Sequence, residues 1–436
     1  MAKIVLIGAG SHGFSRNLIT DIISYPELRD GTITLMDIDA KALDLIAAFA
    51  KKLVEQQGFK TRIEYTTNRR EALAGANYVF TTIRVGGQEA YQADLAVTSK
   101  YELNTGTTIG PIGVFLGTRQ VPVILEICHE MEELCPDAWL IDYSNPMAII
   151  TWAIHDYSKI KSIGLCHSVQ GTAATLAKYI GVPREEVSYW VAGINHMAWF
   201  LEFKWRGKDA IPLLREALKD PRVYSSTDAQ WDGPDIVRAE VFKNFGYYVT
   251  EASTIFAEFV PYFRKRGRPE LFDTYKIRGV DSKATIKSQA DRDAELKRQI
   301  DEGYKFPTKR SSEFAIMIVH AIETGEPLRI NSNVMNKGLI TNLPEGCCVE
   351  VPCLVDKEGI HPCYVGDLPP QLAALNRTSI NVQELAVRGI VEKDKTKIFH
   401  SMLLDPLTSS MLTIDEIRKM TYEMFKAGSK FLKGYK

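Results

Sequence analysis

The first group of residues that could carry chemistry is a glycine-rich turn near the start of the chain. Gly8, Gly10 and Gly13 form the pattern G-x-G-x-x-G between a short apolar stretch and a helical pattern. Glycines let the backbone turn tightly and approach a pyrophosphate, which would sit on the free N–H groups at the helix start. Ser11 could cap that helix or contact phosphate. The alternative is that these glycines only close a tight strand–helix turn.

An acidic residue extends this pattern. Asp37 follows a β-branched stretch and lies 27 residues after Gly10. A carboxylate there accepts hydrogen bonds from the adenosine ribose and repels a 2′-phosphate, so the pattern predicts NAD rather than NADP. His12 has no predicted role, and we expect it to be an exposed loop residue.

A thiol and an imidazole form the second group. Cys166 and His196 each lie in a turn that contains a glycine and follows an apolar strand pattern. A thiolate and a neutral imidazole are good ligands for a first-row transition ion, and two protein ligands leave positions open for substrate hydroxyls. Spacing alone leaves another interpretation open, in which Cys166 is a small buried apolar residue and His196 a core histidine.

The elements that must position these groups alternate between strand and helix in the first part of the chain. This alternation predicts a Rossmann-type parallel sheet with helices on both faces, forming an NAD-binding domain over residues 1–165. The strand patterns are residues 5–7, 32–37, 63–65, 78–83 and 139–143, and the helical ones are 18–23, 43–53 and 121–134.

The alternation weakens after about residue 165. We therefore expect residues 166–436 to form a packed α+β domain, and the candidate metal and substrate groups that follow residue 165 belong to it. It is expected to contain strands at 187–194, 199–203 and 328–365, and helices at 282–301, 378–402 and 413–432.

Composition narrows the possible partners. The chain has 436 residues, 45% of them hydrophobic and 25% charged, with a net charge of −1. This balance argues against nucleic acid or an anionic membrane as a partner. No apolar run approaches the roughly 20 residues that a membrane span needs. Seven scattered cysteines fit reduced thiols, so we expect a cytoplasmic protein.

Several separated segments carry a resemblance to a known family. The chain resembles the NAD- and manganese-dependent glycosidases of glycoside hydrolase family four, and within it the α-galactosidase group. The segments that carry the resemblance are the N-terminal glycine turn and residues 36–39, 145–148, 164–172, 193–198, 342–344, 346–351, 372–375 and 380–383.

The resemblance implies an oxidative mechanism of glycoside cleavage. NAD takes hydride from carbon 3 of the sugar, a base removes the acidified hydrogen on carbon 2 while Mn²⁺ stabilises the charge, and the aglycone leaves from carbon 1. Water then adds and the hydride returns, so NAD is regenerated. Cys166 and His196 match the metal ligands of the family. Asn145 matches a substrate-contacting asparagine, although Asn-Pro also forms turns.

The acid and the base follow from the same resemblance. His167 stands where some relatives carry an acidic residue that acts as general acid, and histidine can protonate a leaving oxygen near neutral pH. The base is expected to be Tyr247, with Tyr248 and Glu251 as alternatives. A nearby metal ion could lower the pKa of a tyrosine. Tyr248 is more readily interpreted as aromatic packing.

The identity of the sugar is predicted from the residues after Cys166. The sequence Cys-His-Ser-Val resembles the α-galactosidase group and argues against a phosphorylated sugar. Arg84 departs from that group; it could bind a sugar carboxylate or anchor the neighbouring glycine turn. The stretch 108–113 is expected to be a loop covering nicotinamide or sugar, with Arg119 and Arg310 as further sugar contacts.

Other functions stay open at this point. The same chemistry could act on α-glucosides or on an acidic sugar such as an α-galacturonide or glucuronide. A plain NAD-dependent hydroxy-acid dehydrogenase shares the expected fold but would accumulate NADH. A non-catalytic NAD-binding sensor is a third class. The resemblance also implies a fold like that of lactate and malate dehydrogenases, and a homodimer or homotetramer that assembles through residues 166–436.

Overall fold

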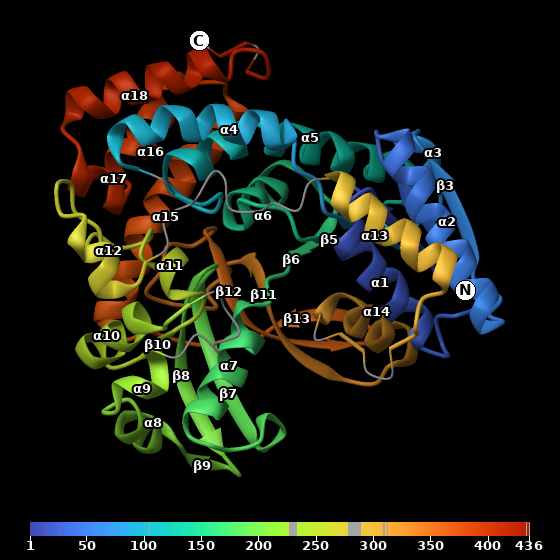
Figure 1. The fold of residues 1–436 in the computed structure, drawn as a ribbon, viewed down its shortest axis with the longest axis horizontal. Coiled ribbons are helices and arrows are strands. Elements are labelled where there is room, and N and C mark those ends of the chain that lie inside the picture. The colour runs from blue at the N-terminus through green and yellow to red at the C-terminus, as the bar shows by residue number, and fades with distance from the viewer. Residues whose placement is uncertain are drawn as a thin grey trace.

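Six parallel strands form one half of the sheet in the computed structural model (Figure 1), which describes residues 1–103, 105–225, 233–277, 289–307, 310–311, 313–432 and 434–435. Their order is β3, β2, β1, β4, β5, β6. The central strands are continuous buried apolar runs, as expected where helices cover both faces of a sheet. The predicted Rossmann-type sheet is confirmed. The strands are β1 (Lys3–Ile7), β2 (Thr32–Met36), β3 (Arg62–Thr66), β4 (Tyr78–Thr81), β5 (Trp139–Asp142) and β6 (Lys161–Gly164).

Helices alternate with these strands. Asp39 begins the second helix by accepting hydrogen bonds from the N–H groups of Lys41 and Ala42, and Gly58 ends it in the left-handed region. The helices of this part are α1 (His12–Ser24), α2 (Ala40–Gln57), α3 (Arg69–Leu73), α4 (Gly87–Thr98), η1 (Ser99–Tyr101), α5 (Gly110–Leu134), α6 (Met147–Tyr157) and α7 (Ser168–Tyr179).

Antiparallel strands extend the same sheet beyond β6. The order continues β6, β11, β12, β7, β8, β10, with β13 beside β12 and β9 beside β8. Because β6 pairs directly with β11, the hydrogen-bonded sheet is continuous across residue 165, and the division into two domains there stays a prediction. The strands are β7 (Val187–Ile194), β8 (Met197–Trp205), β9 (Lys208–Asp209), β10 (Tyr248–Val249), β11 (Leu328–Met335), β12 (Cys348–Asp356) and β13 (Gly359–Pro362).

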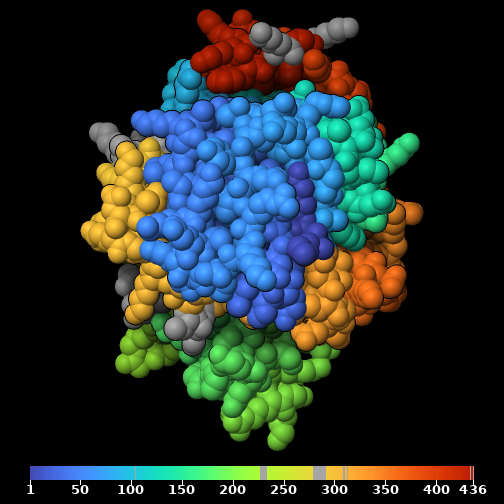
Figure 2. Space-filling model, turned by 90° about the vertical axis from the view of Figure 1, so that its right-hand side faces the viewer, coloured from blue at the N-terminus to red at the C-terminus, as the bar shows by residue number. Residues whose placement is uncertain are grey.

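Several helices from the second half of the chain pack against helices from the first half. Figure 1 shows α15, α16 and α18 beside α4, α5 and α6, and α13 across α1 and α2. In Figure 2 the yellow segment that holds α13 lies alongside the blue N-terminal elements. These helices are η2 (Arg184–Glu186), α8 (Ile211–Ala217), α9 (Pro221–Ser225), α10 (Ile236–Phe245), α11 (Ser253–Phe256), α12 (Glu270–Tyr275), α13 (Gln289–Glu302), α14 (Phe314–Thr324), α15 (Pro370–Val391), α16 (Lys395–Leu404), α17 (Pro406–Met411) and α18 (Ile414–Ala427).

One predicted boundary was wrong and another is only partly tested. Helix α5 begins at Gly110, well before the predicted start at residue 121, so the last four of the six residues in the predicted loop 108–113 form the first turn of a helix. The three glycines of its first turns obscured the helical pattern. The predicted helix over 282–301 is confirmed from Gln289 onward, and its first residues lie outside the described part of the chain.

Helix α5 is also long and apolar enough to cross a membrane by composition alone. However, 78% of its most apolar window is buried inside the protein, where it packs against α15, α6 and α4. It is a core helix of this fold. The sequence analysis did not identify α5 as one apolar run because polar residues such as Gln120 interrupt it. The Gln120 side chain is itself buried in the structure.

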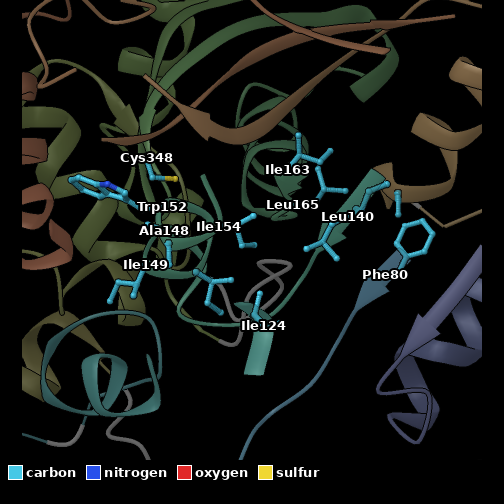
Figure 3. Close-up of a cluster of buried hydrophobic side chains, with 14 of the residues drawn as sticks. Phe80, Ile124, Leu140, Ala148, Ile149, Trp152, Ile154, Ile163, Leu165 and Cys348 are labelled. Carbon is cyan, nitrogen blue, oxygen red and sulfur yellow. The ribbon is translucent and has the colours of Figure 1, made fainter. Parts of the chain in front are cut away.

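A buried apolar cluster supports the edge of the sheet where the site lies. Figure 3 shows Leu140, Ile163 and Leu165 packed together with side chains from α5, α6, β4 and β12. Leu165 is 2% exposed and directly precedes Cys166. The thiol is therefore held on a rigid part of the core rather than on a free loop.

Candidate metal and nucleotide site

Four of the predicted site residues follow neighbouring parallel strands. Gly8 follows β1, Arg84 follows β4, Asn145 follows β5, and Cys166 follows β6. Since parallel strands share one carboxyl edge, all four lie at the same side of the sheet, which is where open α/β sheets bind their ligands. The order of strands also reverses direction between β1 and β4, and such a switch point is where sheets of this type bind dinucleotides.

Two glycines of the glycine turn are packed too closely against their neighbours to be replaced by residues with side chains. Gly8 has a φ of +89°, and a Cβ there would lie 2.9 Å from the backbone oxygen of Thr82. A Cβ on Gly10 would lie 2.8 Å from Asp37 Oδ2, which instead accepts a hydrogen bond of 2.7 Å from the Gly10 N–H. The turn and the acidic residue are thus held together before any ligand binds. These residues fit a dinucleotide.

The remaining members of the turn differ in role. Ser11 is the N-cap of α1, yet its side chain makes no capping hydrogen bond and is exposed. A Cβ on Gly13 would meet no atom within 4 Å, so close packing does not require this glycine. The prediction that His12 is an exposed loop residue was wrong. Its ring is buried, with Nε2 3.1 Å from the Ala42 oxygen and Nδ1 3.1 Å from Asp293 Oδ1 of α13.

Three potential metal ligands converge at the end of β6. Cys166 Sγ lies 3.3 Å from His196 Nε2, and the same nitrogen lies 3.0 Å from Glu251 Oε2. These three atoms all lie within 4.8 Å of one another. His196 occupies the tight turn between β7 and β8, and Glu251 follows β10, which pairs with β8. The fold therefore brings together residues from three separate turns.

The electrostatics of this cluster favour a cation. Burial, with Glu251 and Glu350 nearby, raises the pKa of the Cys166 thiol well above its usual range. Burial also raises the pKa of the Glu350 carboxyl to about 8. Within the described residues neither oxygen of Glu350 has a hydrogen-bond partner, and the Nδ1 atom of His196 has none either. A thiol, an imidazole and the Glu251 carboxyl group form a donor set that suits a divalent transition ion, and the Glu350 carboxyl group lies near this set without belonging to it.

The sheet register explains the position of Glu350. Glu350 of β12 is opposite Gly193 of β7 on one side and Asn333 of β11 on the other, and Asn333 is opposite Gly164 of β6. Residues opposite each other in neighbouring strands project to the same face. Glu350 thus lies in a row that joins the turns carrying Cys166 and His196. Sequence reasoning named it only as part of a strand.

His167 lies at the mouth of the cluster. Its side chain is 51% exposed, and its Nδ1 atom is 3.9 Å from Glu313 Oε1 at the start of α14. Glu313 was missed by sequence reasoning, because nothing near it in the chain marks a site. Burial raises the pKa of Tyr143 well above its usual value, and the Glu313 carboxylate adds to that rise.

The structure does not bring the predicted base to the metal cluster. Tyr247 is half-buried in a surface pocket of about 510 Å³ whose lining includes Glu202 and Arg215 and excludes all three potential metal ligands. Tyr248 is fully buried and donates a hydrogen bond of 2.6 Å to Asp235 Oδ2, which agrees with a packing role. Of the predicted candidates, Glu251 alone lies beside His196.

The three arginines that were predicted as possible sugar contacts have different surroundings in the structure. Arg119 is buried and binds Asp94 through two hydrogen bonds, of 2.5 and 3.3 Å. Arg310 binds Ser24 at the end of α1 and stacks on a tyrosine ring, so both guanidinium groups are engaged in structural contacts. Arg84 is exposed at the carboxyl edge, with its guanidinium carbon 5.3 Å from the centre of the Tyr91 ring.

A third buried carboxyl group, that of Glu258, lies near the cluster. Glu258 accepts hydrogen bonds of 2.9 and 2.8 Å from the Gly106 N–H and lies 3.8 Å from Arg264. Burial raises its pKa to about 7, while Arg264 and His196 oppose that rise. Glu258 was also missed, because the segment that it holds in place is more than a hundred residues away in the chain.

Comparisons with known proteins cover the whole chain. The model described as family 4 glycosyl hydrolase matches residues 3–182, and the model of the family 4 glycosyl hydrolase C-terminal domain matches residues 191–408. An α-galactosidase of Bacillus subtilis (strain 168) is 38% identical over 439 residues, covering 100% of both chains. An α-galactosidase of Rhizobium meliloti (strain 1021) is 36% identical, covering 99% of this chain and 89% of that one.

A solved structure has the same fold. A 6-phospho-α-glucosidase from gut microorganisms, solved in complex with NAD and Mn²⁺, superposes with a TM-score of 0.83 at 20% identity, covering 99% of this chain and 98% of that one. At this level of identity the likeness shows the fold. It extends over both the parallel and the antiparallel parts of the sheet.

Proposed function

The chain belongs to the family 4 glycosyl hydrolases, and from this premise we propose that it is an α-galactosidase that uses NAD and Mn²⁺. The observation that carries the proposal is 38% identity to the Bacillus subtilis α-galactosidase over the full length of both chains. Identity of this extent supports the same reaction and the same sugar more strongly than a local motif does.

Residues of this chain fit both NAD and the metal ion. Gly8, Gly10, Ser11, Gly13 and Asp37 would hold NAD at the carboxyl end of β1. Cys166 and His196 would hold the metal ion at the carboxyl end of β6, on the same edge of the sheet. When bound, NAD supplies reversible hydride acceptance and the metal ion supplies stabilisation of negative charge.

The chain's own side chains would move protons and orient the sugar. His167, exposed at the mouth of the cluster and 3.9 Å from Glu313, is proposed to protonate the leaving oxygen. Asn145, half-buried between β5 and α6, is proposed to bind a sugar hydroxyl. Tyr247 stays a proposed base, and to act it would need to approach the cluster from its surface pocket.

The charges near the cluster favour a neutral sugar. Glu251, Glu258, Glu313 and Glu350 are all partly or fully buried around it, and Arg264 is already close to Glu258. A sugar carboxylate would enter this region against several carboxyl groups, whereas hydroxyl groups can donate hydrogen bonds to them. This argument supports galactosides over galacturonides.

The test is a panel of nitrophenyl α-glycosides with NAD, Mn²⁺ and a reductant. We expect release from the α-galactoside, loss of activity after removal of NAD or metal, and solvent deuterium at carbon 2 of the released galactose. NADH should not accumulate, which separates this reaction from that of a hydroxy-acid dehydrogenase. Full activity after thorough removal of NAD would refute the proposal, as would release from another sugar alone.

A second candidate substrate is an α-galacturonide, and Arg84 favours it. No carboxylate pairs with its guanidinium among the residues that the structure describes, and it lies exposed at the ligand edge. A free guanidinium can bind a carboxylate through two hydrogen bonds. If the galacturonide is the substrate, Arg84→Met should raise its KM strongly and leave the galactoside KM nearly unchanged; equal KM changes would dismiss this candidate.

We also propose that the protein is a cytoplasmic homodimer or homotetramer. Its seven cysteines are unpaired, which agrees with a reducing compartment. Light scattering coupled to gel filtration would give the mass of the assembly. A monomer of 49.0 kDa at micromolar concentration would contradict the assembly.

A further inference from the structure

Resting on the proposed metal-dependent function, we propose that Glu251 is a third protein ligand of the metal ion and not the base that removes the carbon-2 hydrogen. The geometry that points to this role is the convergence of one oxygen, one nitrogen and one sulfur atom within 4.8 Å of one another. Sequence reasoning placed Glu251 among the candidates for the base and assigned only Cys166 and His196 to the metal.

The separations match those of ligands around one ion. Ligand nitrogen and oxygen atoms lie about 2.1 Å from a first-row divalent ion and sulfur about 2.3 Å. Two such ligands at right angles are therefore about 3.0 Å apart for N and O, and about 3.1 Å for N and S. The structure has 3.0 Å from His196 Nε2 to Glu251 Oε2 and 3.3 Å from the same nitrogen to Cys166 Sγ.

Hydrogen bonding alone satisfies this arrangement poorly. His196 Nε2 can make only one hydrogen bond, as donor or as acceptor, yet it has two close neighbours, Cys166 Sγ and Glu251 Oε2. A shared cation would satisfy the lone pairs of all three atoms at once. The buried Glu350 carboxyl, which lacks a hydrogen-bond partner among the described residues, adds a second sign that positive charge belongs here.

The backbone fixes Glu251 in this position. Its φ is +74°, a left-handed conformation that residues other than glycine seldom adopt, and His196 has a φ of +64°. Such strained residues persist where the surrounding structure determines them, often at ligand sites. Glu251 is 3% exposed, and its other oxygen accepts a hydrogen bond of 3.1 Å from the Ala252 N–H.

These contacts argue against a role as base. A general base needs an oxygen that is free to face the hydrogen it removes. Glu251 Oε1 accepts a hydrogen bond from the Ala252 N–H and Oε2 lies 3.0 Å from His196 Nε2, so both oxygens are already held by protein groups. With Cys166, His196 and Glu251 as ligands, the remaining positions around the ion are left to two sugar hydroxyls or water.

The first experiment measures Mn²⁺ affinity without NAD or sugar, by electron paramagnetic resonance of the unbound ion. Glu251→Gln is compared with Glu350→Gln, which removes a neighbouring buried carboxyl group that lies outside the three-atom cluster. Circular dichroism and thermal unfolding of both metal-free variants check the fold. We expect Glu251→Gln to weaken Mn²⁺ binding at least tenfold, and Glu350→Gln to weaken it less than threefold.

The outcomes separate this inference from the proposed function. Mn²⁺ affinity of Glu251→Gln within threefold of the unaltered chain overturns the inference, as does an equal loss in both variants, which would show a general charge effect. An unaltered chain that binds no Mn²⁺ overturns the proposed function as well.

The second experiment distinguishes a ligand from a base. Deuterium exchange at carbon 2 of a bound sugar is followed in Glu251→Gln with NAD as Mn²⁺ is raised well above its dissociation constant for that variant. A lost ligand can be compensated by more metal, so exchange should return to within about tenfold of the unaltered chain. If metal binds fully and exchange stays absent, Glu251 is the base and the inference is wrong.

Discussion

Replacing Gly10 by alanine tests whether Asp37 is positioned through the glycine turn. A Cβ on Gly10 would lie 2.8 Å from Asp37 Oδ2 and 3.0 Å from Ala42 Cβ, whereas ordinary contacts begin at about 3.4 Å. Gly10 does not have a positive φ, so alanine brings no backbone strain. The carboxylate must therefore move away and lose its hydrogen bond of 2.7 Å from the Gly10 N–H.

The magnitude follows from the hydrogen bonds that the Asp37 carboxylate would accept from the adenosine ribose. A hydrogen bond to a charged group contributes about 1.5–3 kcal/mol, and 1.4 kcal/mol corresponds to tenfold in affinity. Displacing Asp37 should therefore weaken NAD binding about tenfold to hundredfold. The assay is calorimetric titration of the metal-free protein with NAD, with circular dichroism to establish that the variant is folded.

Gly13→Ala is the matched control. A Cβ there meets no atom within 4 Å, and the residue lies in the first turn of α1. We expect its NAD affinity to stay within about threefold and its stability to rise, since alanine is favoured over glycine in a helix by about 1 kcal/mol. Unchanged NAD affinity in Gly10→Ala would refute the reasoning. Equal losses in both variants would show that the added methyl groups crowd the phosphates and that Asp37 is not the cause.

Three further predictions concern the buried charges and the thiol. Arg119→Met should lower the free energy of unfolding, measured with denaturant, by about 3–5 kcal/mol, because it leaves Asp94 buried and unpaired. The double variant with Asp94→Leu should recover part of that loss. If the single and the double variant lose the same free energy, Arg119 and Asp94 do not act as a pair. Burial raises the pKa of Asp142 from 3.8 to about 6, so its proton stabilises the folded state below pH 4, and that stability is lost as the pH rises through 6. Asp142→Asn should therefore gain up to about 3 kcal/mol on the unaltered chain between pH 4 and pH 7, measured by urea unfolding at each pH, and a constant difference would refute this. Peroxide should abolish Mn²⁺ binding by oxidising Cys166, and dithiothreitol should restore it at the sulfenic acid stage; retained binding after complete oxidation of the thiol, followed by mass spectrometry, would exclude the thiolate as a ligand.

Local patterns predicted the parallel half of the fold because its physics is local. Buried parallel strands are short apolar runs, and each is followed by a helix with its own pattern, so the alternation is visible in the chain. The glycine turn and Asp37 were predictable for the same reason, since both belong to one strand–helix–strand unit. Helix α5 was predicted too short because glycines near its start serve the turn and hide the helical pattern.

The chemistry of the metal cluster was only half predictable. Cys166 and His196 lie in recognisable turns, but Glu251, Glu313 and Glu350 come to them through contacts that no local pattern encodes. His12 shows the same limit. It was expected to be exposed because its neighbours form a turn, yet α13, which is almost three hundred residues away in the chain, covers it.

The continuity of the sheet explains how distant residues come to share one site. Gly164, Asn333, Glu350 and Gly193 are opposite one another in four neighbouring strands, so the turn after β6 and the turn after β7 are fixed in the same rigid row. A metal ion that needs its ligands placed to within a fraction of an ångström is better served by one sheet than by two domains that move independently. If the division at residue 165 were a mobile boundary, β6 and the turn that begins at Cys166 would move relative to β7 and His196, but β11 pairs with β6 and β12 pairs with β7. The hydrogen bonds of those two strands hold the distance between the ligands, and we therefore expect the substrate-induced motions of this enzyme to occur in the surrounding loops rather than between its halves.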